Sequence, residues 1–147
     1  MSLKWLCAKE LEPCRGSVEA AGFDFRASCD AVLWPLWIRA LTGTGPNLIR
    51  TGVRWQAPRG TYMKIESRSG LVVNANVHAV AGVIDSDYRG EIVVALENRS
   101  MFPRRVRACE RIAQGIVLQH CLLEPKLVDE LGGSERGEGG FGSTGSD

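Results

Sequence analysis

Glycine and proline recur along the whole chain and leave no long uninterrupted segment. The sequence has 17 glycines and 6 prolines among its 147 residues. Both residues interrupt regular structure, because glycine loses more backbone entropy on folding than any other residue and proline lacks an N–H donor. We therefore expect short secondary-structure elements that are joined by turns.

The segments between these interruptions have the composition of β-strands. They are rich in valine, isoleucine and aromatic residues, and several alternate between apolar and polar side chains, which is the period of a strand. The predicted strands are 23–27, 48–55, 61–66, 71–84, 91–97 and 112–118. Helical periodicity is weak, and the best candidates are 30–40 and 126–131. Many short strands between turns predict an all-β fold, namely a sandwich, barrel or jelly roll.

Composition excludes several classes of protein. At 147 residues, with 44% hydrophobic and 24% charged residues, the chain is expected to form one globular domain. A net charge of +1 gives no basic field for nucleic acid. Neither a signal peptide nor an apolar run of about 18 residues is visible, so we expect no membrane partner. The cysteines are odd in number and lack metal-site spacing, which predicts free thiols and an intracellular location, cytoplasm or nucleus: Cys7, Cys14, Cys29, Cys109 and Cys121.

The glycine-rich stretch 136–145 has two interpretations. One is a disordered tail. The other is a ligand-binding arm, because one arginine, one aromatic ring and two hydroxyls stand among the glycines: Arg136, Phe141, Ser143 and Thr144. A guanidinium pairs with phosphate, a ring stacks on a base, and hydroxyls bind phosphate oxygens. This stretch alone does not decide between the two.

Two carboxylates and a tyrosine lie in a turn between two strand-like runs. Asp85, Asp87 and Tyr88 precede Gly90. In one interpretation the aspartates cap the turn and the glycine supplies a positive φ. In the other, one aspartate is a general base beside an aromatic wall.

Arginine and small polar residues follow another predicted strand. Arg68, Ser69 and Gly70 form a small anion-binding sequence, and Gln114 lies in the last predicted strand. Each is compatible with an ordinary surface position as well. His78 and His120 are isolated in the sequence, which argues against a histidine metal site.

The order of these segments resembles the five motifs of the trimeric dUTPase family. The segments that match are 21–25, 68–71, 82–90, 111–114 and 136–145, and the resemblance extends from about residue 3 to 145. It implies a distorted jelly roll, with a β core at 1–131 and a flexible C-terminal arm at 132–147 that closes the active site. It also implies a homotrimer with exchanged arms. The implied reaction is hydrolysis of dUTP to dUMP and pyrophosphate with Mg²⁺.

The resemblance also implies a role for each matching residue. Asp85 would activate the water that attacks the α-phosphorus, and Tyr88 would pack on the deoxyribose. Backbone groups of Gly82, Val83 and Ile84 would read the uracil. The phosphates would be held by Arg68, Ser69, Gly70, Gln114, Arg136, Ser143 and Thr144. Phe141 would stack over the base, and Gly142 would bind the substrate beside it. Asp24 would position metal-bound waters, and no protein side chain is expected to bind Mg²⁺ directly.

Some positions depart from the family pattern. Met63, Glu66 and Ser67 differ from the usual second motif, and Glu66 adds negative charge near the phosphate-binding residues. Trp34 and Trp37 lie in a stretch that matches poorly, and we expect them in the core or a subunit interface. Two alternatives therefore stay open. The first is a catalytically impaired dUTPase-like interaction module, and the second is a dCTP deaminase, which shares the fold.

Overall fold

The computed structural model describes residues 2–135 and 137–138 and confirms the all-β prediction. Within these residues, eleven strands alternate with two short α-helices and one 3-10 helix. The strands are β1 Lys4–Leu6, β2 Gly22–Arg26, β3 Ala31–Leu33, β4 Asn47–Arg50, β5 Arg54–Gln56, β6 Thr61–Glu66, β7 Val77–Val80, β8 Val83–Asp85, β9 Val93–Asn98, β10 Arg104–Val106 and β11 Arg111–Gln119. The helices are η1 Lys9–Leu11, α1 Leu36–Leu41 and α2 Ser69–Ala75. None of the described helices is long and apolar enough to cross a membrane.

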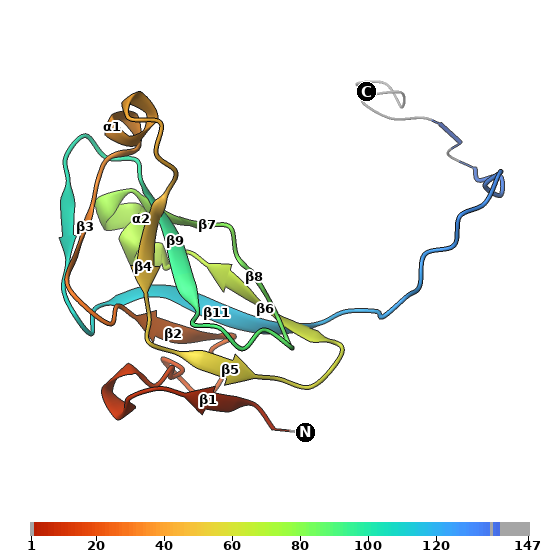
Figure 1. Ribbon diagram of the computed structural model, residues 1–147, viewed down its shortest axis with the longest axis horizontal. Helices are drawn as coiled ribbons and strands as arrows, with labels where there is room; N and C mark the ends of the chain where they lie inside the picture. Colours follow the sequence, from red (N-terminus) through yellow and green to blue (C-terminus); the bar gives the residue numbers. More distant parts are fainter. Residues whose placement is uncertain (1, 136, 139–147) are drawn as a thin grey trace.

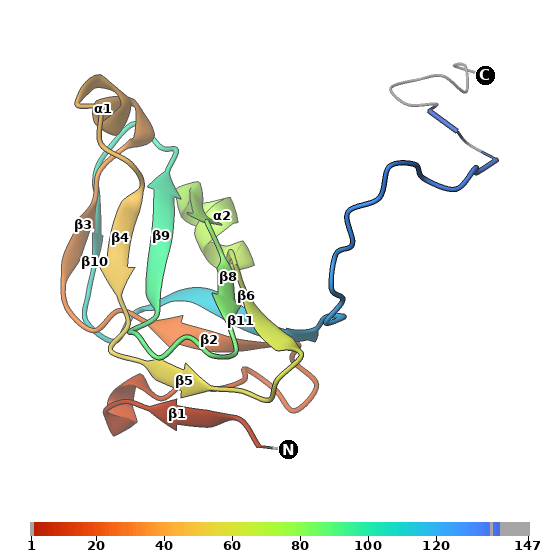
Figure 2. The same cartoon turned by 45° about the vertical axis from the view of Figure 1, so that its right-hand side comes forward.

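The strands form two larger and two smaller antiparallel sheets (Figure 1). The larger sheets have the orders β2-β11-β6-β8 and β4-β9-β7, and the smaller ones pair β1 with β5 and β3 with β10. Figures 1 and 2 show β4 and β9 running across the direction of β2 and β11. Both larger sheets therefore contribute one face to a shared core.

The core is filled by alternate residues of these strands. Phe25 of β2 and Met63 of β6 are fully buried and face each other across β11. Gly115 lies between them, and a Cβ at this position would stand 2.5 Å from Met63 Sδ and 2.7 Å from the Phe25 ring. Close packing of two large side chains thus requires glycine in the middle of β11.

The predicted strand 71–84 is wrong over its first part, which forms α2. The helix turns Leu71 into the core, leaves Val73 81% exposed and ends at Asn76 with a φ of 50°. Valine composition favours strands, but the choice is made by which side chains can be buried. The remaining part divides into β7, which pairs with β9, and β8, which pairs with β6.

Three further predictions need correction. The predicted strand 48–55 is divided into β4 and β5 by Thr51, whose hydroxyl donates to Ile92 O at 2.6 Å, and by Gly52, whose φ is 70°. The helix predicted at 30–40 begins only at Leu36, after Pro35, because proline suits the start of a helix and not its interior. Residues 126–131 form no helix.

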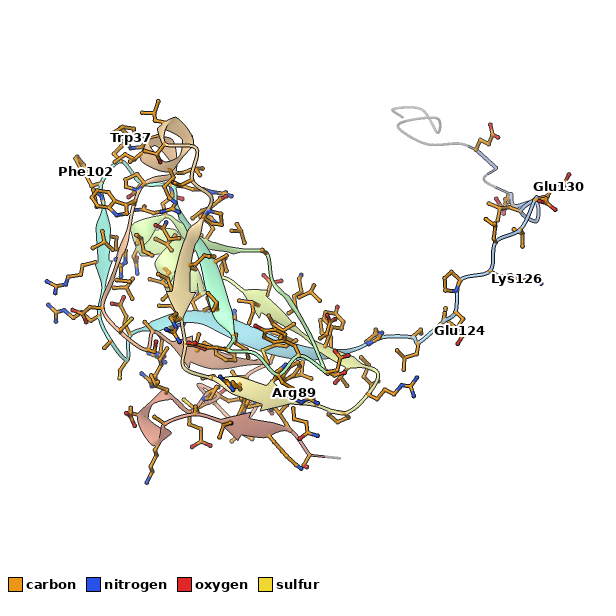
Figure 3. The ribbon with its side chains drawn as sticks, in the orientation of Figure 1. Trp37, Arg89, Phe102, Glu124, Lys126 and Glu130 are labelled. Atoms are coloured by element: carbon orange, nitrogen blue, oxygen red, sulfur yellow. The ribbon has the colours of Figure 1, made fainter. Side chains whose placement is uncertain are left out.

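Trp34 and Trp37 are not part of the core of this chain. Their side chains are 47% and 48% exposed, and Trp37 Nε1 donates to Met101 O at 3.2 Å. Figure 3 shows Trp37 and Phe102 together at the end of the molecule that carries α1. The prediction of a core position is therefore wrong, and a subunit interface stays a prediction.

Asn98 is a fully buried polar residue at the end of β9. Its Nδ2 donates to Leu33 O and Phe102 O, both at 2.9 Å. Its Oδ1 accepts from the Ser100 N–H at 3.0 Å and the Ser100 hydroxyl at 2.6 Å. One side chain thus joins β3, β9 and the turn before β10.

Replacing Asn98 with alanine is expected to lower the free energy of unfolding by about 1–3 kcal/mol, because buried carbonyl and N–H groups lose their partner. Urea denaturation measures this change. Asn74→Ala removes the same amide from an exposed position on α2 and serves as the control. Equal effects of the two substitutions would contradict a stabilising role for Asn98.

Candidate active site

An arginine pair shares one carboxylate at the junction of β2, β11 and α2. Asp24 Oδ1 accepts from Arg68 Nε at 3.0 Å, and Asp24 Oδ2 accepts from Arg111 Nη1 at 3.0 Å. Arg68 Nη1 also donates to Arg111 O at 3.2 Å. The Asp24 side chain is only 15% exposed. This charge network fixes the Arg68 guanidinium at the surface, and Ser69 and Gly70 follow it in the first turn of α2.

Gln114 lies next to this network on β11. It is opposite Asp24 of β2 on one side and Glu66 of β6 on the other. Directly opposed residues share a face of a sheet, so the Glu66 carboxylate is on the same face as Gln114. Lys64 Nζ lies 2.6 Å from Glu66 Oε1, which provides a local counter-charge, and this hydrogen bond raises the pKa of Lys64 above its ordinary value.

Asp85 and Tyr88 lie at the other end of β6, where Asp85 is opposite Tyr62. Trp55 Nε1 donates to the Asp85 carbonyl at 3.2 Å, and the Tyr88 N–H donates to the same oxygen at 3.1 Å. The Tyr88 hydroxyl donates to Glu91 O at 3.1 Å. These contacts hold the turn through its backbone carbonyls, and the Asp85 side chain stays exposed.

Gly90 allows the Tyr88 ring to lie against this turn. A Cβ at Gly90 would stand 2.2 Å from the Tyr88 hydroxyl oxygen. The ring and the aspartate then border a cavity of about 190 Å³, lined by Val83, Ile84, Asp85, Tyr88, Glu91 and Val93. A flat aromatic wall and a carboxylate therefore face the same space.

A second cavity of about 520 Å³ borders Asp85 as well, with Arg59, Asp87, Arg89 and His120 in its lining. Arg89 Nη1 donates to Ser86 O at 2.8 Å, so this arginine supports the turn (Figure 3). Sequence reasoning assigned Arg89 no role. Arg89 donates to backbone carbonyls, which any residue type can supply, so no side chain in the sequence indicates its partners. Its place within the 82–90 motif was the one indication of a role.

The segment between β7 and β8 passes from one sheet to the other. Ala81 has a φ of 54°, and Gly82 O accepts from the Ile65 N–H at 2.7 Å. A Cβ at Gly82 would lie 2.6 Å from Ile65 O, so the two backbones approach as closely as only glycine permits. β8 is an edge strand of its sheet, so its outer edge presents backbone groups.

The structure brings together Asp24, Arg68, Ser69, Gly70 and Gln114 in one group, and Gly82, Val83, Ile84, Asp85 and Tyr88 in another. Strand pairing fixes the order of these groups along β6. Asp85 lies opposite Tyr62, Gly82 contacts Ile65, and the arginine network lies beyond Glu66. The predicted roles of Arg136, Phe141, Gly142, Ser143 and Thr144 fall outside the described residues.

The described residues contain no group of three or more His, Cys, Asp or Glu that could hold a metal ion. Both oxygens of the one candidate, Asp24, accept from arginines. A metal that reaches this surface would therefore have to bring most of its ligands with it.

A dUTPase family model matches residues 10–145. The chain belongs to the dUTPase family. It is 41% identical over 138 residues to the deoxyuridine 5′-triphosphate nucleotidohydrolase of Eremothecium gossypii, covering 92% of this chain and 84% of that protein. The enzyme of the same name from Yarrowia lipolytica is 40% identical over 149 residues, with coverage of 99% and 90%.

A solved structure of the Staphylococcus bacteriophage 80alpha dUTPase with dUpNHpp has the same fold. Its TM-score is 0.83 at 26% identity, and the match covers 99% of both chains. The predicted family and jelly-roll-like β fold are thus confirmed for this dUTPase.

Glu91 links the end of the turn that holds Asp85 and Tyr88 to β4. Its carboxylate accepts from Arg50 Nη2 at 2.6 Å and from the Gly52 N–H at 2.8 Å. The Arg50 hydrogen bond, with a smaller contribution from the Gly52 amide, holds the pKa of Glu91 below its ordinary value against the opposing effect of burial.

Because the folded-state pKa of Glu91 is lowered, its stabilisation is present above the unfolded-state pKa and is lost as pH falls through the folded-state pKa. Glu91→Gln is expected to lower the free energy of unfolding by about 0.5–1 kcal/mol at pH 7. The difference from wild type should shrink as the pH is lowered and the wild-type carboxylate protonates. Urea midpoints at a series of pH values measure it, and a pH-independent difference would contradict this explanation.

Proposed function

We propose that this chain hydrolyses dUTP to dUMP and pyrophosphate, with Asp85 activating the water that attacks the α-phosphorus. The observation that carries this proposal is the cavity in which Asp85 and Tyr88 face the same space beside an open strand edge. The family match supports the substrate, because the curated relatives bear the name of dUTP nucleotidohydrolases.

The order of groups along β6 supports an active site that is shared between copies. In dUTP, the base is followed by the sugar, the α-phosphate and then the outer phosphates. Along one chain the order is Asp85, then the base-reading segment at Gly82, then Arg68 and Gln114. One nucleotide cannot place its base between its α-phosphate and its outer phosphates. The phosphate-binding group that completes a site therefore belongs to a neighbouring copy.

The C-terminal segment supports exchange of arms in a homotrimer. After β11 the chain leaves the core, and Leu123, Leu127 and Leu131 are 83%, 99% and 90% exposed. Figure 3 shows Glu124, Lys126 and Glu130 on this segment, away from the sheets. Leucines and carboxylates on one segment suit a surface that is both apolar and basic.

Such a surface lies over β1 and β5. A cavity of about 390 Å³ there is lined by Trp5, Leu6 and Trp55 together with the basic residues Lys4, Arg54 and Arg89. Burying exposed leucines against it is favourable by about 1.5–3 kcal/mol per side chain. In a neighbouring copy, the segment that carries these leucines fits this surface by apolar contact and by charge.

Discrimination against ribonucleotides and other bases follows from shape and backbone geometry. The Tyr88 ring lies flat against the deoxyribose and leaves no space for a 2′-hydroxyl. Backbone groups of Gly82, Val83 and Ile84 pair with the uracil edge. Their direction is set by the close approach of Gly82 to Ile65.

Catalysis requires a positioned water and a neutralised leaving group. Asp85 accepts the proton of the attacking water, which forms the new bond to the α-phosphorus, while the bond to the pyrophosphate oxygen breaks. Arg68, with the N–H groups of Ser69 and Gly70 and the Gln114 amide, binds the outer phosphates. A Cβ at Gly70 would have no tertiary neighbour within 4 Å, so packing does not require glycine here and a phosphate has room to approach the backbone.

The absence of a protein metal site among the described residues fits Mg²⁺ that would be carried by the triphosphate. There it would neutralise phosphate charge. Because both Asp24 oxygens are engaged by arginines, Asp24 acts through Arg68 and through metal-bound waters rather than as a direct ligand. Glu66 is balanced by Lys64, so its charge does not favour the interpretation of an impaired module. The names of the relatives do not favour a dCTP deaminase.

Asp85→Asn is expected to reduce kcat for dUTP by roughly 10²–10⁴ while nucleotide binding is retained, because the amide keeps the shape but cannot accept the proton. Release of pyrophosphate from dUTP with Mg²⁺ measures this, and wild-type protein tests the proposed function itself. Asp87→Asn is the control and should change kcat little. Wild-type turnover by the Asp85→Asn protein would contradict a role for Asp85 as the base and leave it only a structural role in the turn.

Deleting residues 135–147 is expected to leave folding and the trimer intact and to reduce kcat/KM by at least about 10²-fold, since Phe141 and Arg136 no longer cover the base and the phosphates. Thermal unfolding and sedimentation check the first part, with a particle near three times 16.0 kDa. Full activity of the truncated protein, or of a stable monomer, would refute the shared site.

A further inference from the structure

Ser67 occupies the junction between the phosphate-binding group and the base-reading segment. It follows β6 and precedes Arg68, and it is partly buried. Its hydroxyl oxygen accepts from the Ala79 N–H at 2.9 Å. Its carbonyl oxygen accepts from Gln114 Nε2 at 3.0 Å. The two oxygens of one residue thus bind two different parts of the proposed active-site surface.

The Ser67 hydroxyl provides a hydrogen-bond acceptor for the Ala79 N–H, which lies at the outer edge of β7. Among the described residues, no strand pairs with this edge. β7 is the last strand of its sheet and pairs with β9 on one side only. The Ser67 hydroxyl takes the place of a strand partner at Ala79. A partly buried N–H that loses its acceptor is costly, so the hydroxyl fixes the local position of the backbone.

Two hydrogen bonds then fix the segment that turns from β7 into β8. Ser67 Oγ binds the N–H of Ala79, and the Ile65 N–H binds the carbonyl of Gly82. Between these two points lie Val80 and Ala81, and Ala81 has a φ of 54°, which is unfavourable for a residue with a Cβ. A backbone in this region stays in place only when its surroundings determine it.

We propose that Ser67 is a positioning residue for base discrimination, setting the backbone segment 79–84 through its hydroxyl and the Gln114 side chain through its carbonyl. This inference rests on the proposed function of the same site. The hydroxyl does not contact the reacting atoms. Its removal therefore changes how the base is read and how tightly the nucleotide binds, while the Asp85 chemistry continues.

Three variants of the full-length protein test this role. Ser67→Ala removes the hydroxyl and keeps the backbone carbonyl. Ser67→Thr keeps a hydroxyl and tests rescue. Ser28→Ala is the control, because Ser28 Oγ also hydrogen-bonds to a distant backbone group, donating to Arg50 O at 3.1 Å, away from the predicted nucleotide-binding residues.

Steady-state kinetics with dUTP and dCTP give the first measurement. For Ser67→Ala we expect KM for dUTP to rise roughly tenfold with kcat within about twofold, and the dUTP-to-dCTP ratio of kcat/KM to fall roughly tenfold. Ser67→Thr and Ser28→Ala should keep the wild-type ratio. A Ser67→Ala protein with an unchanged ratio, or with only a lower thermal midpoint, would overturn the proposal.

Amide hydrogen exchange of the peptide that contains residues 77–82 gives a measurement that needs no turnover. Exchange at Ala79 should be faster in Ser67→Ala than in wild type and unchanged in Ser28→Ala. Unchanged exchange would show that the hydroxyl does not hold the segment and would overturn the proposal. If wild-type protein releases no pyrophosphate from dUTP, the proposed function fails, and exchange alone decides whether Ser67 holds the segment.

Discussion

The antiparallel pairing of β6 with β11 and β8 is the constraint on which the site depends. β6 pairs with strands from both groups of site residues, because β11 carries Gln114 on one side and β8 carries Asp85 on the other. A shift of one residue in either register would move these side chains to the opposite face. The large buried side chains of β6, Met63 and Ile65, oppose such a shift, so core packing specifies the geometry of the surface.

The proposed recognition of the base by backbone groups depends on close approaches between segments, and the sequence accommodates these approaches with small residues. Gly82 allows contact with Ile65, and Gly90 makes room for the Tyr88 ring. Gly70, in another motif, differs, since a Cβ there would have no tertiary neighbour within 4 Å. Packing of the chain therefore requires glycine at 82 and 90, and it does not require glycine at 70.

The charged groups are organised before any substrate arrives. Asp24 fixes Arg68 and Arg111, and Glu91, which follows the Tyr88 turn, forms an ion pair with Arg50 of β4. Bidentate or shared arginine–carboxylate contacts restrict side chains that would otherwise lose conformational entropy on binding. This preorganisation supports the proposed binding of phosphates by Arg68.

The amino-acid sequence alone determined the β class, the family and most of the strands. Two-residue alternation is a local property, and the order of the motifs is read directly along the chain. It did not separate α2 from β7, because the valine-rich composition of this stretch predicts a strand throughout. The helical conformation of the first part is the one that buries Leu71 in the core. It also left Trp34 and Trp37 open between the core and a subunit interface, and the structure excludes the core of this chain. The contacts of Ser67, the pairing of Asp24 with two arginines and the order of groups along β6 were decided by tertiary structure alone. Each joins residues more than ten positions apart, and such contacts depend on register and packing that no local pattern encodes.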